Sequence, residues 1–246
     1  MVNKRYTSII VTSHIPDKKR ADIFKESIQS LLETTKDLPV EIIIVDNGGD
    51  AHTSGYIDGL LLGGAVQMVI HNANNMHFGF ARNQGIILSN GNYIVSADND
   101  ILYEEGWLEA CWEALEAYPT KKVYATPIQY PRAVNGKLHK RYDLGDILVG
   151  DDHYHLNTRA GSNCFVIRKR DLMNIGLFKH HRVVGTVWTD NANNKGYSAI
   201  VTPNDMVVDL GLRNGYNLKQ PLPIKRTLRN GEEVFFNQDE YKIPNK

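Results

Sequence analysis

The sequence has 246 residues, and its 28 lysines and arginines balance 28 aspartates and glutamates to a formal net charge of zero. This length suits one large domain with its own core, and the neutral charge argues against a general polyanion binder. Two cysteines, Cys111 and Cys164, stand far apart, which excludes a disulfide framework and a zinc-binding spacing. No apolar run is long enough for a signal peptide or membrane span, so the composition predicts a globular cytoplasmic protein.

The first hundred residues alternate between short apolar runs and helical patterns. The predicted strands are the continuous β-branched and apolar runs at 8–12, 41–45, 66–70 and 93–97. The predicted helices, with apolar residues every three or four positions, are 21–33 and 77–89. Apolar strands separated by helices predict a parallel sheet covered on both faces, with ligand sites at the carboxyl ends of its strands.

The second half is less regular. A helix is predicted at 104–117, and short strands are predicted at 123–128, 164–167 and 199–201. No repeat or linker interrupts the chain, so we expect a single α/β domain built on a Rossmann-like, mixed but mostly parallel sheet flanked by helices. The glycines between the second and third strands are expected to lie in loops: Gly48, Gly49, Gly55, Gly59, Gly63 and Gly64.

The turn after the first strand excludes two large enzyme classes. It reads Thr12-Ser13-His14-Ile15-Pro16 and contains no glycine. Dinucleotide-binding turns and P-loops both need glycines so that the backbone can approach phosphates closely. Rossmann oxidoreductases and P-loop NTPases are therefore excluded.

The most informative motif is Asp98-Asn99-Asp100, directly after the predicted strand 93–97. Hard cations such as Mg²⁺ and Mn²⁺ prefer oxygen ligands and are often shared between carboxylates and substrate phosphates. The alternative is a turn whose side chains cap the next helix. The position at a strand end favours the metal interpretation.

A second motif is Gly79-Phe80-Ala81-Arg82-Asn83-Gln84-Gly85, which precedes the Asp-x-Asp strand. Together with the first two strands, these motifs resemble the family-2 glycosyltransferases, which have the GT-A fold. The resemblance covers about residues 7–118, in the order and spacing of that family. It implies a nucleoside-diphosphate-sugar donor and transfer of the sugar to an acceptor hydroxyl.

The resemblance also implies roles for individual residues in donor binding. Thr12, His14 and Asp46 would hold the nucleobase and ribose, and Asp98 and Asn99 would face the donor. A carboxylate is a suitable acceptor for a base N–H, although Asp46 could instead form a turn with the following Asn-Gly. Arg82 could balance phosphate charge, or it could form an ion pair with one of the carboxylates.

The implied cofactor is Mn²⁺ or Mg²⁺, held by Asp98 and Asp100. Similar enzymes often carry a His-x-Gly farther along the chain, with the histidine as a further metal ligand. This sequence has Asp209-Leu210-Gly211 there, so Asp209 is expected to be the third ligand.

The catalytic base is less clear, because the Glu-Asp pair that the family commonly carries is missing. Asp190 is the first candidate for the base. Asp151 and Asp152, two consecutive residues in a loop that could fold over the site, are the second candidates. An inverting reaction needs such a base, and a retaining mechanism on the same fold stays open. Two further hypotheses are a sugar-phosphate nucleotidyltransferase and an inactive nucleotide-sugar-binding module.

The resemblance divides the single domain into a nucleotide-sugar-binding half (1–118), an acceptor half (119–218) and a basic tail (219–246). The acceptor class is open among glycans, lipid-linked glycans, proteins and modified nucleic acids. Charge is segregated along the chain, since 83–120 has no Lys or Arg and 210–231 has no Asp or Glu. A site between these segments would hold a cation beside a diphosphate.

Overall fold

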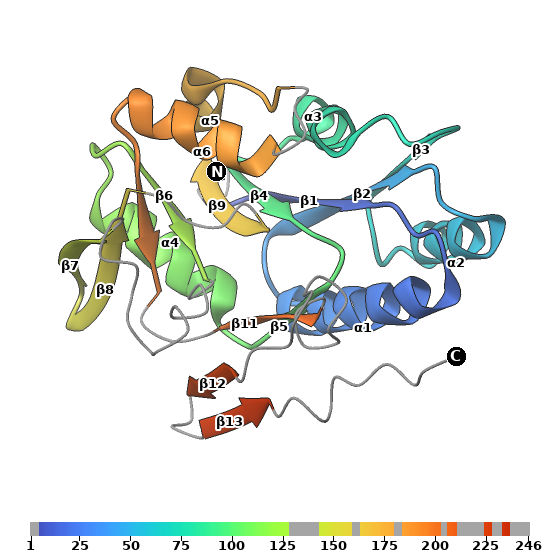
Figure 1. Ribbon diagram of the computed structural model, residues 1–246, viewed down its shortest axis with the longest axis horizontal. Helices are drawn as coiled ribbons and strands as arrows, with labels where there is room; N and C mark the ends of the chain where they lie inside the picture. Colours follow the sequence, from blue (N-terminus) through green and yellow to red (C-terminus); the bar gives the residue numbers. More distant parts are fainter. Residues whose placement is uncertain are drawn as a thin grey trace.

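The computed structural model describes residues 5–127, 143–158, 163–179, 184–202, 206–210, 224–227 and 233–236. One nine-stranded sheet runs through these residues, with strand order β3-β2-β1-β4-β9-β6-β10-β8-β7 (Figure 1). None of the helices in these ranges is both long and apolar enough to cross a bilayer.

The first half of the chain supplies four neighbouring parallel strands, in the order β3-β2-β1-β4. The strands are β1 (Thr7–Ser13), β2 (Val40–Asn47), β3 (Met68–Asn72) and β4 (Tyr93–Ala97). The connecting helices are α1 (Lys18–Thr35), α2 (Ala51–Leu62) and α3 (Phe78–Leu88). All four strands therefore end at the same edge of the sheet, where the predicted motifs lie.

The second half extends the sheet with both strand directions. The further strands are β6 (Val123–Thr126), β7 (Asp143–Val149), β8 (Asp152–Asn157), β9 (Cys164–Arg168) and β10 (Ser198–Val201). In the described residues, β8 and β9 run against the other seven of the nine strands. The expected mixed, mostly parallel sheet in an α/β domain is confirmed.

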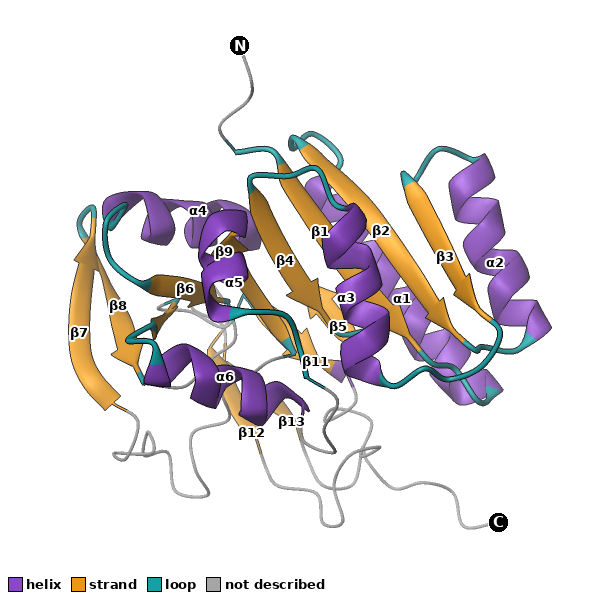
Figure 2. Ribbon diagram, turned by 90° about the horizontal axis from the view of Figure 1, so that it is seen from above, coloured by secondary structure: helices purple, strands orange, loops and turns teal. Residues whose placement is uncertain are grey.

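Helices cover both faces of this sheet, as Figure 2 shows. Alternate residues of a strand point to opposite faces, so Ile9 and Val11 pack with α1, whereas Ile10 packs with α3. The first face also carries α2 and α4 (Trp107–Ala117). The second carries α5 (Lys169–Ile175) and α6 (Val184–Asn194). The two faces therefore have separate hydrophobic cores.

Two small antiparallel pairs lie outside the main sheet. β12 (Ile224–Thr227) pairs with β13 (Glu233–Phe236), and β5 (Ile101–Tyr103) pairs with β11 (Val207–Asp209). In the second pair Asp209 lies opposite Ile101, and the Leu210 N–H donates to the Asp100 carbonyl at 2.7 Å. The backbone at Asp209 is therefore held beside the Asp-x-Asp segment.

Helix α2 is the main departure from the predicted elements. The glycines between β2 and β3 were expected to lie in loops, and for Gly55 and Gly59 this prediction is wrong, because both are inside α2. Asp50 caps the helix by accepting from the Thr53 N–H at 2.8 Å, and the helix residue Ile57 is fully buried. Capping and burial outweigh the low helix propensity of two glycines.

Candidate active site

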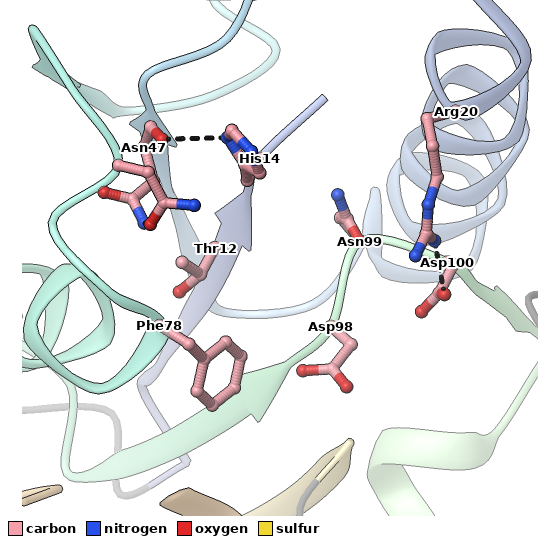
Figure 3. Close-up of a pocket in the computed structure, with 9 residues that line it drawn as sticks. Thr12, His14, Arg20, Asn47, Phe78, Asp98, Asn99 and Asp100 are labelled. Carbon is pink, nitrogen blue, oxygen red and sulfur yellow. Dashed lines mark hydrogen bonds and ion pairs between the residues drawn. The ribbon is translucent and has the colours of Figure 1, made fainter. Parts of the chain in front are cut away.

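A cavity of about 370 Å³ opens at the carboxyl ends of β1, β2 and β4 (Figure 3). Its lining is mostly polar and comes from Thr12, His14, Arg20, Asn47, Asn75, Phe78, Asp98, Asn99 and Asp100. The whole Asp-x-Asp segment and both donor-binding candidates of the first loop thus face one space. This is the edge of the sheet where parallel α/β folds bind ligands.

Asp98 is the first carboxylate of the motif and follows β4 directly. Its backbone N–H donates to the Asn163 carbonyl at 2.7 Å, which ties it to the segment before β9. Its Oδ1 accepts from Arg82 Nη2 at 2.7 Å, and the side chain remains 30% exposed. Asp98 is thus held in place from behind while part of its carboxylate stays accessible.

Arg82 is a completely buried guanidinium on α3. Besides Asp98, it donates to Ser96 Oγ and the Ala97 carbonyl, and its guanidinium carbon lies 3.9 Å from the ring centre of Phe78. Burial lowers the pKa of Arg82, and the Asp98 carboxylate acts in the opposite direction. An arginine keeps its charge even so, and of the two roles considered for Arg82 the structure contains the ion pair with a carboxylate.

Asp100 is paired with a different arginine. Arg20 Nη1 on α1 lies 2.9 Å from Asp100 Oδ2, and Figure 3 shows the guanidinium reaching down to this carboxylate. Arg20 was not among the predicted site residues. Arg20 belongs to the basic run Lys18-Lys19-Arg20, which is typical of a solvent-exposed helix surface. Asp100 is 80 positions away in the sequence, so no local sequence pattern indicates that the two residues pair.

Thr12 presents a buried hydroxyl at the base of the cavity. Its Oγ1 has no hydrogen-bond partner within the described part of the chain, and the residue is only 6% exposed. A buried hydroxyl without a partner is costly, so this atom is suited to a ligand. His14 lies at the rim, where its Nδ1 is 3.2 Å from the Asn47 carbonyl.

Asn47 organises the opposite wall of the cavity. Its Nδ2 donates to Asn75 Oδ1 at 3.0 Å, and its Oδ1 accepts from Asn72 and from the Met76 N–H. Gly48 permits this close approach, because its φ is 77° and a Cβ there would lie 2.7 Å from Asn74. The sequence indicated Asn47 only as part of a turn, yet it lines the cavity.

Asp46 is not among the residues that line the cavity. Its carboxylate accepts from the Gly49 N–H, from Ser54 and from His71, at 2.9, 2.5 and 3.0 Å. The turn considered for Asp46 in the sequence is therefore present, and the contact with a nucleobase stays a prediction. His71 also contacts Asp58 at 2.9 Å, and this hydrogen bond, followed by the one to Asp46, raises its pKa.

The candidate bases do not line the cavity. Asp190 is half-buried on α6. Asp151 and Asp152 are exposed at the β7–β8 turn. β8 stands four strand positions from β4, which corresponds to about 19 Å across the sheet. Their catalytic roles stay predictions.

A divalent cation fits the oxygen ligands that this site offers. Asp98, Asn99 and Asp100 bring carboxylate and amide oxygens to one cavity wall, which is the ligand chemistry of Mg²⁺ and Mn²⁺. The residues described with their side chains contain no cluster of three metal-binding side chains. Asp209, the predicted third ligand, is placed by its backbone next to this wall.

Three solved structures have a similar fold. They are a mannosyltransferase from Pyrobaculum calidifontis in complex with GDP-Man and Mn²⁺, GalNAc-T7 with UDP, GalNAc and Mn²⁺, and TarS from S. aureus. Their TM-scores are 0.64, 0.62 and 0.60, at 16%, 13% and 13% identity. The matches cover 85%, 82% and 85% of this chain but only 58%, 43% and 62% of the others. The GT-A fold is thereby confirmed.

Sequence comparison gives the family. The glycosyltransferase GlyG of Streptococcus pneumoniae serotype 4 is 24% identical over 109 residues, which cover 44% of this chain and 36% of that protein. The chain thus spans about a third of the length of this relative. A family model described as glycosyl transferase family 2 matches residues 8–176, well over half of the chain. With the fold and the carboxylate-lined cavity in agreement, this chain belongs to glycosyl transferase family 2.

Proposed function

We propose that this protein is a metal-dependent glycosyltransferase that moves a sugar from a nucleoside-diphosphate sugar to an acceptor hydroxyl. One observation carries the proposal: Asp98 and Asp100 line the same cavity as Thr12 and His14. A donor needs a cation for its diphosphate and polar groups for its nucleoside, and this cavity offers both. Two neighbouring folds contain a nucleotide or nucleotide sugar together with Mn²⁺, which supports the proposal.

The metal site would be built from Asp98 and Asp100, with Asp209 as the third ligand and Mn²⁺ or Mg²⁺ as the ion. When bound, the cation would neutralise the charge that develops on the departing diphosphate. Arg82 orients the first carboxylate from beneath, through the 2.7 Å ion pair. The amide of Asn99 lies on the same wall, within reach of the donor.

The nucleoside would lie between the ends of β1 and β2. The Thr12 hydroxyl, which has no hydrogen-bond partner among the described residues, and the exposed His14 imidazole would donate to it from one side. Asn47 would form the other side, while Asp46 holds the loop through its bonds to Gly49 and Ser54. A direct contact of Asp46 with the base would require this loop to open.

We further propose an inverting reaction with Asp190 as the base and Asp152 as the second candidate. A double-displacement retaining mechanism needs a nucleophile beside the anomeric carbon. Among the described residues that line the cavity, the carboxylates are Asp98 and Asp100, and both are assigned to the cation, so this described lining offers no separate nucleophile. The base of an inverting reaction would likewise come from outside this lining. The anomeric configuration of the product, measured by NMR, tests inversion directly.

The test of the function is a donor panel. Radiolabelled nucleotide sugars should be hydrolysed or transferred in the presence of Mn²⁺ and left intact after chelation with EDTA. Asp98→Ala should abolish metal-dependent donor binding by calorimetry. Circular dichroism should show that the variant, although destabilised by the loss of the ion pair with Arg82, is still folded at the assay temperature. Asp37→Ala, which removes an exposed carboxylate after α1, is the matched control and should bind like the wild type. Donor binding that persists in Asp98→Ala would refute the ligand assignment.

A further inference from the structure

We propose that Arg20 is an exchangeable counter-cation of this site. It neutralises Asp100 in the metal-free protein, releases this carboxylate to the divalent cation, and then binds the diphosphate of the donor. The inference rests on the proposed function and adds a residue that the family motifs do not contain. It predicts that Arg20 opposes metal binding in the empty site and favours nucleotide binding in the loaded one.

The first argument is the burial of Asp100. The residue is only 6% exposed, and a carboxylate withdrawn from water needs a positive partner or strong donors. Arg20 supplies the positive charge at 2.9 Å. The metal-free site is therefore stabilised by a cation that occupies part of the ligand shell a metal ion would use.

The second argument is the position of Arg20. It lies in the first turn of α1, where its backbone N–H donates to the capping Asp17 side chain at 2.9 Å. The Arg20 backbone is thus fixed in the helix, while the residue lines the same cavity as Asp98 and Thr12. A small rotation of a long side chain would turn this guanidinium from Asp100 toward a diphosphate, whose oxygens match its fork of donors.

The third argument is the contrast between the two arginines. Arg82 is completely buried, donates to three acceptors and stacks on Phe78, and it does not line the cavity. Arg20 has a side chain that is 19% exposed. A divalent cation on these carboxylates would repel both guanidiniums, and the one that lines the cavity has room to move. Arg82 is built to stay, and Arg20 is the cation that can move.

The experiment compares Arg20→Gln with Lys18→Gln, which removes an exposed cation from the same turn of α1. Free Mn²⁺ is counted by electron paramagnetic resonance in the absence of nucleotide. Binding of UDP and GDP is then measured by calorimetry at saturating Mn²⁺. We expect Arg20→Gln to tighten Mn²⁺ binding about fivefold and to weaken nucleotide binding about tenfold. Lys18→Gln should change neither.

Changes of opposite sign are the signature of exchange. If Arg20→Gln weakens both Mn²⁺ and nucleotide binding, Arg20 only positions Asp100, and the inference is overturned. If wild-type protein binds no nucleotide with Mn²⁺, the proposed function itself fails, which is a separate result. Should Arg20→Gln unfold, a structure of the wild-type protein with Mn²⁺ and nucleotide decides: we expect Arg20 on phosphate oxygens, and an intact pair with Asp100 would refute exchange.

Discussion

At the scale of single residues, the two carboxylates of the motif differ in how they are held. Asp98 rests on Arg82, which is completely enclosed by protein, and Asp100 rests on Arg20, which borders the cavity. A buried guanidinium without its carboxylate, or the reverse, is much more costly than an exposed one. The ion pair behind Asp98 should therefore contribute to stability as well as to geometry.

Loss of Arg82 should destabilise the whole fold. Arg82→Gln removes the ion pair with Asp98 and the buried hydrogen bonds of the guanidinium to Ser96 and Ala97, so the free energy of unfolding should fall by about 3 kcal/mol. Urea unfolding followed by circular dichroism measures this change. Arg170→Gln is the control, because that side chain is 68% exposed and its loss should cost less than about 0.5 kcal/mol. Equal stability of both variants would contradict the assigned role.

His71 should give the protein a pH-dependent stability. Its hydrogen bond to Asp58 and then that to Asp46 raise its pKa above the ordinary 6.5. The stabilisation is therefore complete below about pH 6.5 and disappears as the pH rises through the higher folded-state pKa. NMR titration of the imidazole should show this raised pKa. Asp58→Asn should move the pKa of His71 back toward 6.5. A wild-type pKa below 6.5 would refute the hydrogen bonds of His71 to Asp58 and Asp46.

Among the helices, the glycines of α2 and α3 differ in how closely the neighbouring residues pack around them. In α2, nothing lies within 4 Å of a Cβ added to Gly59. In α3, a Cβ on Gly85 would lie 2.6 Å from Ile10 Cγ2, because the helix packs directly against β1. The last glycine of the Ala-Arg-Asn-x-Gly motif thus allows α3 to approach the sheet and to place Arg82 beneath Asp98.

These environments predict alanine substitutions of opposite sign. Gly59→Ala should raise the free energy of unfolding by about 0.5–1 kcal/mol, because it restricts the unfolded chain and meets no clash. Gly85→Ala should lower it by about 1–3 kcal/mol through overpacking against Ile10. Chemical denaturation of both variants in parallel measures the difference. A destabilised Gly59→Ala would mean that α2 is packed differently from the structure.

At the scale of the whole molecule, what could be predicted from sequence follows the range of the interactions. β4 has the predicted bounds, Tyr93–Ala97, because all five residues of this strand are buried and the strand therefore appears in the sequence as a continuous, largely apolar run. Asp98 and Asp100 could be singled out because they follow this strand directly, at the edge where α/β sheets bind ligands, and both line the cavity. Arg20 was missed because its partner lies 80 positions away. Helix α2 was missed because distant contacts, such as that of Tyr56 with Phe24, hold its glycine-containing turns in place.

The topology joins these distant parts at one edge of the sheet. β9 runs against β4, so the segment before it arrives beside Asp98, where the Asn163 carbonyl accepts the Asp98 N–H. On the other side, β11 holds the backbone of Asp209 against β5. The proposed cation and diphosphate would therefore connect α1, β1, β2 and β4 with segments of the second half. Their binding should stabilise the fold as a unit.

This connection predicts a synergistic thermal shift. At a hundredfold excess over its dissociation constant, a ligand that binds only the native state adds about 2.7 kcal/mol. For a protein of this size, that raises the melting temperature by about 5–10 °C. Because the cation bridges carboxylates and diphosphate, Mn²⁺ and UDP or GDP together should produce more than the sum of their separate shifts. Differential scanning fluorimetry measures the four conditions, with Asp98→Asn as the variant that should lose the synergy. Shifts that are merely additive in the wild-type protein would show that nucleotide and metal bind independently, and would contradict the proposed bridging site.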